Sequence, residues 1–187
     1  CAASTHKNEE ELCGLVHQKL KKKHKKLLTI IIPRHIERTR TIINEMKSLN
    51  LKVHAHSSKN KLHEDTDIYL VDSYGKTKSF FKICKTVFLG GSIIAHGGQN
   101  PLEAARYGCK ILHGPNIWNF KEVYDLLNKH KVSSKTKNLN QIVDNVDKIL
   151  KNKADSKSIK YKIVKIGKRI LNSTIKEINF YVKKNES

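Results

Sequence analysis

A glycine-rich stretch that leads into a helix start carries the strongest chemical signal in this 187-residue sequence. Gly97 and Gly98 precede Asn100-Pro101-Leu102-Glu103, where an apolar-periodic run begins. Proline in the first turn and glutamate near the positive end of the helix dipole are typical of a helix N-terminus. Free backbone N–H groups in such a loop hold a phosphate, and Glu103 can accept hydrogen bonds from sugar hydroxyls. The same pattern describes an ordinary strand-to-helix turn, so both interpretations stay open.

Arg34 occupies a second position that suits anion binding. Residues 27–32 form a short apolar, β-branched run ended by Pro33, which predicts a strand buried on both faces. Arg34 follows directly, where an α/β sheet presents groups to its ligands, and a guanidinium can hold a phosphate through two hydrogen bonds. The alternative is a surface arginine at the sheet edge. His35 either donates to the same phosphate or begins the next helix.

A third loop follows the strand predicted at residues 67–71. Asp72-Ser73-Tyr74-Gly75 precedes a helix, so its backbone N–H groups can point at the ligand of Arg34. The ring of Tyr74 offers contact area for a flat base. Ordinary surface or strand-end roles are expected for four other histidines, His54, His56, His96 and His113.

Strands and helices alternate along the first 137 residues, an order that predicts a parallel sheet with helices on both faces. In this Rossmann-like α/β fold, ligands bind at the carboxyl ends of the strands. Strands are predicted at residues 27–32, 52–56, 67–71, 86–89 and 110–112, and helices at 9–23, 36–49, 77–84, 101–107 and 121–130.

The chain changes character from residue 138 onward. Apolar residues at helical spacing continue one helix to Leu150, and after a polar break at 152–158 a second helix runs over 159–182 with a lysine-rich polar face. An amphipathic basic helix either packs across its own domain or lies on anionic lipid. We expect two units, residues 1–137 as the α/β layer and 138–187 as basic helices that pack on it.

The charge is strongly positive. Thirty-seven lysines and arginines against 17 acidic residues give a net charge of +20, which attracts nucleic acid, anionic lipid or phosphorylated ligands. The charge is spread along the chain, and the dense cluster at 21–26 is expected to be a solvated helix end. A nucleic-acid-binding module is the alternative function from another class. Against it, basic and aromatic residues do not interleave and no nucleic-acid motif is recognisable.

The cysteines indicate neither a metal site nor a disulfide framework. Cys1, Cys13, Cys84 and Cys109 show no CxxC spacing and no histidine pairing of the zinc-site kind. Free thiols fit a reducing cytosol. No run approaches the ~20 apolar residues that a membrane span requires.

Four groups of residues follow one another along the chain. They are Ser4-Thr5-His6 with Glu9-Glu10-Glu11, Ile32-Pro33-Arg34-His35 with Glu37-Arg38, Asp72-Ser73-Tyr74-Gly75, and the stretch 90–120 that contains Asn100-Pro101-Leu102-Glu103. Their order and spacing resemble the nucleotide-sugar-binding half of the bacterial 3-deoxy-D-manno-octulosonic acid (Kdo) transferases. The resemblance covers residues 2–130. Because the chain starts with Cys close to the first motif, we expect a C-terminal piece of a longer protein.

The resemblance implies the C-terminal half of a GT-B glycosyltransferase, which binds CMP-Kdo for the transfer of Kdo, with inversion, to a lipid A precursor. The segment Ser4 to His6 is expected in the loop that closes the cleft. Tyr74-Gly75-Lys76 stands where the family has Met-Gly-Glu, so Lys76 reverses a charge. The residues that match the CMP contacts are Pro33, Arg34, Tyr74, Gly75, Lys76, Asn100, Pro101, Leu102 and Glu103, and further candidates are His35, Ser4, Thr5, His6, Gly97 and Gly98.

The resemblance also implies a division of labour between two domains. The family's catalytic glutamate and membrane-associating surface belong to an N-terminal acceptor domain, so this chain is expected to hold no catalytic residue and to be inactive alone. Neither a metal nor another cofactor is implied. A GT-B C-terminal helix crosses back to brace the other domain. The full protein is expected in the bacterial cytoplasm at the inner membrane, with a CMP-sugar donor and a lipid A precursor as partners. A GT-B transferase for another activated sugar remains an alternative.

Overall fold

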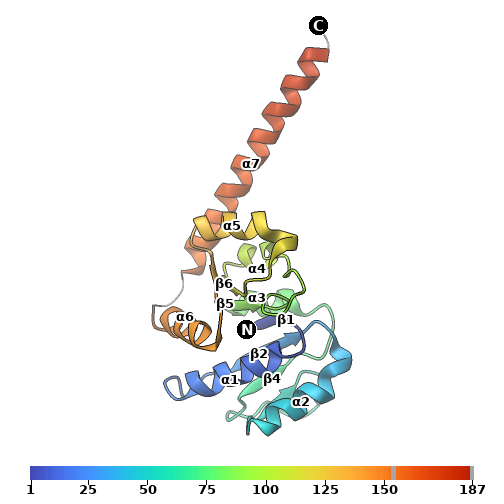
Figure 1. The fold of residues 1–187 in the computed structure, drawn as a ribbon. Helices are drawn as coiled ribbons and strands as arrows, with labels where there is room; N and C mark the ends of the chain where they lie inside the picture. Colours follow the sequence, from blue (N-terminus) through green and yellow to red (C-terminus); the bar gives the residue numbers. More distant parts are fainter. Residues whose placement is uncertain (153–154, 186–187) are drawn as a thin grey trace.

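One sheet of seven strands organises the computed structural model, which describes residues 1–152 and 155–185 (Figure 1). The strand order is β3-β4-β2-β1-β5-β6-β7, and every neighbouring pair is parallel. The strands are β1 (Ala2–Thr5), β2 (Thr29–Pro33), β3 (Val53–Ala55), β4 (Ile68–Leu70), β5 (Thr86–Leu89), β6 (Lys110–His113) and β7 (Ser133–Lys135). The helices are α1 (Glu9–Lys21), α2 (Thr39–Ser48), α3 (Thr77–Ile83), α4 (Leu102–Arg106), α5 (Lys121–Lys129), α6 (Leu139–Asn152) and α7 (Ser156–Asn185), with 3-10 turns η1 (Ile36–Arg38) and η2 (Trp118–Phe120).

Helices cover both faces of this sheet. Successive strand residues point to opposite faces, and the buried pairs Ala2/Ala3 and Ile31/Ile32 divide accordingly between two hydrophobic cores. Ala2 and Ile31 pack with residues of α1, α2 and α6. Ala3 and Ile32 pack with residues of α3, α4, α5 and the start of α7. The Rossmann-like α/β layer predicted from the sequence is confirmed.

The first strand corrects one prediction. Ser4 and Thr5 were expected in a loop that closes the cleft, but they belong to β1, which pairs with β2 and β5 in the middle of the sheet. Thr5 is fully buried, and His6 follows at the carboxyl end of the strand. The small residues of Ala2–Thr5 carry little strand signal of their own. Pairing on both edges makes this segment a strand.

Two other segments differ from the predictions. The polar edge strand β7 was not predicted, because Ser133–Lys135 has neither the length nor the apolar pattern of the other strands. The helix predicted at residues 36–49 begins as the 3-10 turn η1 and continues as α2.

The sheet reverses its winding between β1 and β5. From β1 the chain first adds β2, β3 and β4 on one side, and β5, β6 and β7 then extend the sheet on the other side. In open parallel sheets, ligands bind in the crevice outside the carboxyl ends of the strands at such a switch point. The loops after β1 and β5 are therefore the natural place for a ligand.

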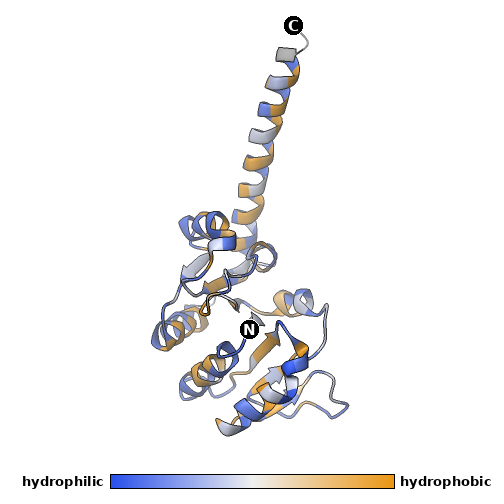
Figure 2. Cartoon of the chain, turned by 45° about the vertical axis from the view of Figure 1, so that its right-hand side comes forward, coloured by the Kyte–Doolittle hydropathy of each residue, from blue (hydrophilic) through white to orange (hydrophobic). Residues whose placement is uncertain are grey.

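The two C-terminal helices behave differently. Helix α6 packs against α1, where the Nε2 atom of His24, just beyond that helix, lies 2.8 Å from Oδ1 of Asp147. Only the first turns of α7 pack on the domain, through the buried Ile159 and Ile166. Residues 167–183 project away from it with an exposed apolar stripe (Figures 1 and 2). Within the predicted unit 138–187, α6 and the beginning of α7 pack on the α/β layer, and the rest of α7 does not. Residues 153–154 and 186–187 of this unit lie outside the described residues.

Helix α7 is much longer than the part of it that packs on the domain. A helix of 30 residues is about 45 Å long, and its buried residues, Ile159 and Ile166, lie in its first three turns. Among the described residues, no helix is long and apolar enough to cross a membrane.

Candidate functional site

Backbone hydrogen bonds hold three loops together at the carboxyl edge of the sheet. The N–H of Arg34, after β2, donates to the carbonyl of Thr5 in β1 at 2.9 Å. The N–H of Gly90, after β5, donates to the carbonyl of Ala3 at 2.9 Å. The segments that contain Arg34, His6 and Gly90 therefore leave the sheet side by side.

Glu9 fixes the shape of the loop after β5. Its carboxylate is fully buried and accepts four backbone hydrogen bonds. Oε2 accepts from His6 at 3.1 Å and Gly91 at 2.7 Å, and Oε1 accepts from Ser92 at 3.1 Å and Ile93 at 3.0 Å. This role of Glu9 was not predicted from the sequence. Three of the four donors lie more than eighty residues away along the chain, and only their backbone takes part.

The glycines of this loop are required by packing. A Cβ at Gly90 would collide with the backbone of Ser4 and Thr5, so the loop touches β1 directly. Gly97 and Gly98 have φ values of 94° and 79°, which favour glycine. Side chains at these two positions would meet Asn119 and Ile117. Close packing against residues 116–119 thus explains both glycines without a ligand.

The predicted helix start at Asn100 is present. Oδ1 of Asn100 accepts a hydrogen bond from the N–H of Leu102 at 3.0 Å, and Pro101 is buried. The Glu103 side chain is 45% exposed, and its Oε1 lies 3.5 Å from Nζ of Lys78 on α3. The amide of Asn100 therefore caps its own helix, while the Glu103 carboxylate remains accessible for ligand hydroxyls.

Arg34 and Tyr74 lie on loops that the structure joins. Arg34 and His35 are exposed, and so are Tyr74, Gly75 and Lys76. The hydroxyl of Tyr74 donates to Oε1 of Glu37 at 3.0 Å, which links the loop after β2 to the loop after β4. The backbone N–H of Glu37 itself and then this hydrogen bond lower the pKa of Glu37, and the same hydrogen bond raises the pKa of Tyr74. Both loops therefore contribute to one surface at the carboxyl edge.

Three histidines gather where β1, β2 and β5 end. The ring centroid of His6 lies 4.3 Å from that of His96 and 5.7 Å from that of His35, the latter edge-on. His6 is buried, and burial lowers its pKa, with the neighbouring His96 lowering it further. His96 has an exposed side chain, as expected, but its contact with His6 was not predicted. His113 is buried at the end of β6, with Nδ1 2.7 Å from the carbonyl oxygen of Gly114, which is a strand-end role.

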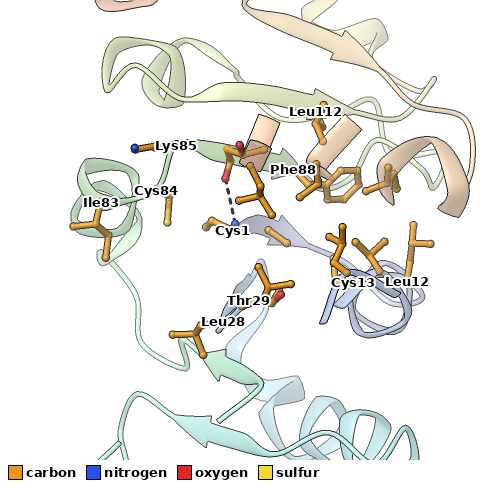
Figure 3. A pocket seen from close by; sticks show the side chains of 18 residues that line it. Cys1, Leu12, Cys13, Leu28, Thr29, Ile83, Cys84, Lys85, Phe88 and Leu112 are labelled. Carbon is orange, nitrogen blue, oxygen red and sulfur yellow. Dashed lines mark hydrogen bonds between the residues drawn. The ribbon is translucent and has the colours of Figure 1, made fainter. Parts of the chain in front are cut away.

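The opposite edge of the sheet has a different character. An apolar cavity of about 280 Å³ opens there, at the amino ends of β1, β2 and β5 (Figure 3). Cys1, Cys13 and Cys84 contribute to its lining, and the amino group of Cys1 donates to the carbonyl of Thr86 at 3.2 Å. Burial raises the pKa values of Cys13 and Cys84, so their thiols stay protonated at neutral pH. The polar groups suited to ligand chemistry lie at the carboxyl edge.

Comparison with known proteins shows to which family the chain belongs. The chain is 33% identical over 126 residues to the 3-deoxy-D-manno-octulosonic acid transferase of Haemophilus influenzae, a match that covers 67% of this chain and 30% of that protein. Its fold matches the C-terminal CMP-Kdo binding domain of WaaA from Acinetobacter baumannii with a TM-score of 0.81 and 27% identity, over 88% of this chain and 86% of that one. The chain belongs to the Kdo transferase family. It spans only 30% of the length of the Haemophilus relative and corresponds to the C-terminal domain.

A more distant structure carries the same fold. The C-terminal domain of a group 1 glycosyl transferase, LpcC from Francisella tularensis, matches this Kdo transferase domain with a TM-score of 0.56 at 14% identity, over 89% of this chain and 82% of that one. That likeness concerns the fold alone and agrees with the C-terminal half of a GT-B glycosyltransferase. No protein-family model matches the chain.

Proposed function

We propose that this Kdo transferase domain binds the donor CMP-Kdo, and that the full protein transfers Kdo from it to a lipid A precursor. The match to the CMP-Kdo binding domain from Acinetobacter carries this proposal, because it extends over 88% of the chain. The clustering of the predicted loops at the switch-point edge of the sheet supports it independently.

The site suggests a role for each predicted contact. Arg34 is exposed beside the switch point and supplies a guanidinium for the donor phosphate. The accessible carboxylate of Glu103 accepts hydrogen bonds from the ribose hydroxyls. Tyr74, held by Glu37, packs its ring against the base. Pro33, Gly75, Lys76, Asn100, Pro101 and Leu102 shape the surrounding backbone, and Lys76 contributes through its amide.

Catalysis requires groups beyond these loops. Displacement at the anomeric carbon needs a base for the acceptor hydroxyl and positive or dipolar groups for departing CMP. Four carboxylates at the carboxyl edge in the described residues have other roles. Glu9 accepts four N–H groups, Glu10 pairs with Arg38 and Glu37 accepts from Tyr74. Glu103 lies beside Lys78 and is assigned to the ribose. We therefore place the base in the acceptor domain, and we expect the reaction to need no metal. In the full protein, the acceptor domain also contacts the cytoplasmic face of the inner membrane.

Calorimetric titration of the chain with CMP, UMP and UDP tests donor binding. We expect CMP to bind, with or without EDTA, and the uridine nucleotides to bind more weakly. Tighter binding of UMP or UDP than of CMP would indicate a transferase for another activated sugar. DNA binding that falls steeply with salt, together with no CMP binding, would instead favour a nucleic-acid module.

A matched pair of variants locates the site. Both Arg34 and Arg40 are exposed, so Arg34→Gln and Arg40→Gln should fold alike. Loss of a charge-assisted contact should weaken CMP binding about tenfold in Arg34→Gln. Arg40→Gln, on α2, should keep the affinity of the unmodified chain. Equal affinities in the two variants would contradict the assignment of Arg34.

A further inference from the structure

The three histidines lie at the point where the sheet reverses its winding. His6 follows β1, His35 follows β2, and His96 lies in the loop after β5. The rings meet at centroid distances of 4.3 Å and 5.7 Å, both measured from His6. Three separate strands thus deliver titratable rings to the crevice in which an open parallel sheet binds its ligand.

His6 has a buried nitrogen that lacks a partner. The residue is 8% exposed, and its Nε2 atom makes no hydrogen bond within the described part of the chain. Buried polar atoms are normally paired, so an unpaired one in a ligand crevice needs an explanation. Gly91 lies directly beside this atom, because a Cβ at Gly91 would be 3.4 Å from Nε2 of His6 and 3.1 Å from Cδ2 of His96. The unpaired nitrogen therefore faces the backbone of the loop after β5.

Burial is the main cause that lowers the pKa of His6 below its usual value. Three neighbours lower this pKa further, namely His96 after β5 and His35 and Arg34 after β2. Among the described residues, the acid that acts on His6 is Glu9, whose carboxylate already accepts four backbone hydrogen bonds. Together with burial, these neighbours lower the pKa of His6. An anion placed among Arg34, His35 and His96 would reverse this balance and stabilise the imidazolium.

We propose that His6, with His96 and His35, binds the phosphate of the donor nucleotide and that His6 takes up a proton as the phosphate enters. The proposal rests on the proposed function, and it assigns the phosphate to the crevice between β1 and β5. Arg34 approaches the same phosphate from the β2 side. Among the described residues, no group of three or more His, Cys, Asp or Glu is arranged to hold a metal ion.

Proton uptake on binding provides the test. CMP is titrated calorimetrically into the 187-residue chain at pH 7.5 in two buffers of different ionisation enthalpy, and the difference in heat gives the number of protons taken up. CMP is mostly a dianion at this pH, because its phosphate has a pKa of about 6. We expect uptake of roughly half a proton or more with CMP, and none with cytidine, which has no phosphate. Equal uptake with cytidine would overturn the link to the phosphate.

Three histidine variants assign the proton. His6→Gln should abolish the uptake and weaken CMP binding about tenfold. His96→Gln changes an exposed side chain, so it keeps the fold and should reduce both quantities even if His6→Gln fails to fold. His54→Gln, on the edge strand β3, is the matched control and should leave both unchanged.

The outcomes separate this inference from the proposed function. Absence of CMP binding in the unmodified chain means that the proposed function is wrong, and with it this inference. Normal CMP binding without proton uptake, with His96→Gln and His54→Gln indistinguishable, refutes the histidine site alone and leaves the donor site intact. Proton uptake that disappears in His6→Gln or falls in His96→Gln, but not in His54→Gln, supports it.

Discussion

Replacement of Glu9 by Gln should destabilise this domain more than most changes of a single atom. In the structure each carboxylate oxygen accepts two backbone hydrogen bonds, at distances from 2.7 to 3.1 Å. A glutamine keeps one of these acceptors and turns the other into an NH₂ group that faces two N–H donors. Two charge-assisted hydrogen bonds are lost, at roughly 1.5–3 kcal/mol each, so the free energy of unfolding should fall by about 3–6 kcal/mol.

Urea denaturation followed by circular dichroism measures this loss. Natural domains have a total stability of about 5–15 kcal/mol, so the variant should unfold at much lower urea or be partly unfolded in buffer. Glu11→Gln is the matched control, because Glu11 lies in the same helical turn but is exposed, and it should change stability by less than about 0.5 kcal/mol. If Glu9→Gln were within 1 kcal/mol or so of the unmodified chain, Glu9 would not hold the loop after β5 as described.

Three further predictions concern the ligand site and the C-terminal helices. Glu103→Gln should cost at most about 1 kcal/mol of stability, because the pair with Lys78 is exposed, yet it should weaken CMP binding about tenfold. Glu122→Gln is the control, and unchanged CMP affinity in both variants would mean that Glu103 is not part of the site. Lys151 and His24 lower the pKa of Asp147 from 3.8 to about 2. The ionised Asp147 should therefore stabilise the α1–α6 contact fully above pH 4 or so, and this stabilisation should be lost as the pH falls towards 2. Amide exchange in α6 that stays constant over this pH range would contradict the prediction. Amides of residues 167–183 in α7 should exchange faster than those of β2, since few apolar contacts protect them, and equal protection would mean that α7 has a partner within the chain.

The sequence predicted the strands that have an apolar run of their own and missed those that are defined by pairing with other strands. The run at residues 27–32 predicted β2 because buried parallel strands are continuous apolar stretches. Ala2–Thr5 and Ser133–Lys135 carry no such run, and β1 and β7 exist because other strands pair with them. Strands of this kind are set by tertiary context, which local patterns do not contain.

The same distinction applies to the site. Arg34 and Tyr74 were predicted because each follows a strand, and the ends of parallel strands share an edge. Asn100 was predicted because it opens a helix after a glycine-rich loop. Whether they contact CMP stays a prediction. The contact of His6 with His96, and the hydrogen bonds of Glu9 to Gly91, Ser92 and Ile93, join segments more than eighty residues apart. Nothing in the local sequence of either partner indicates such a contact.

The central position of β1 has a consequence for how the domain assembles. Its two neighbours in the sheet come from later parts of the chain. Glu9, shortly after β1, accepts hydrogen bonds from residues 91–93 of the loop after β5. Contacts of such high sequence separation form slowly, because a long loop must close before they stabilise anything. The end of β1 and the loop after β5, where we propose the donor site, therefore come together only when both halves of the sheet have joined. A nucleotide that binds there acts on the folding equilibrium of the whole domain, and its affinity can be measured as a rise in the melting temperature.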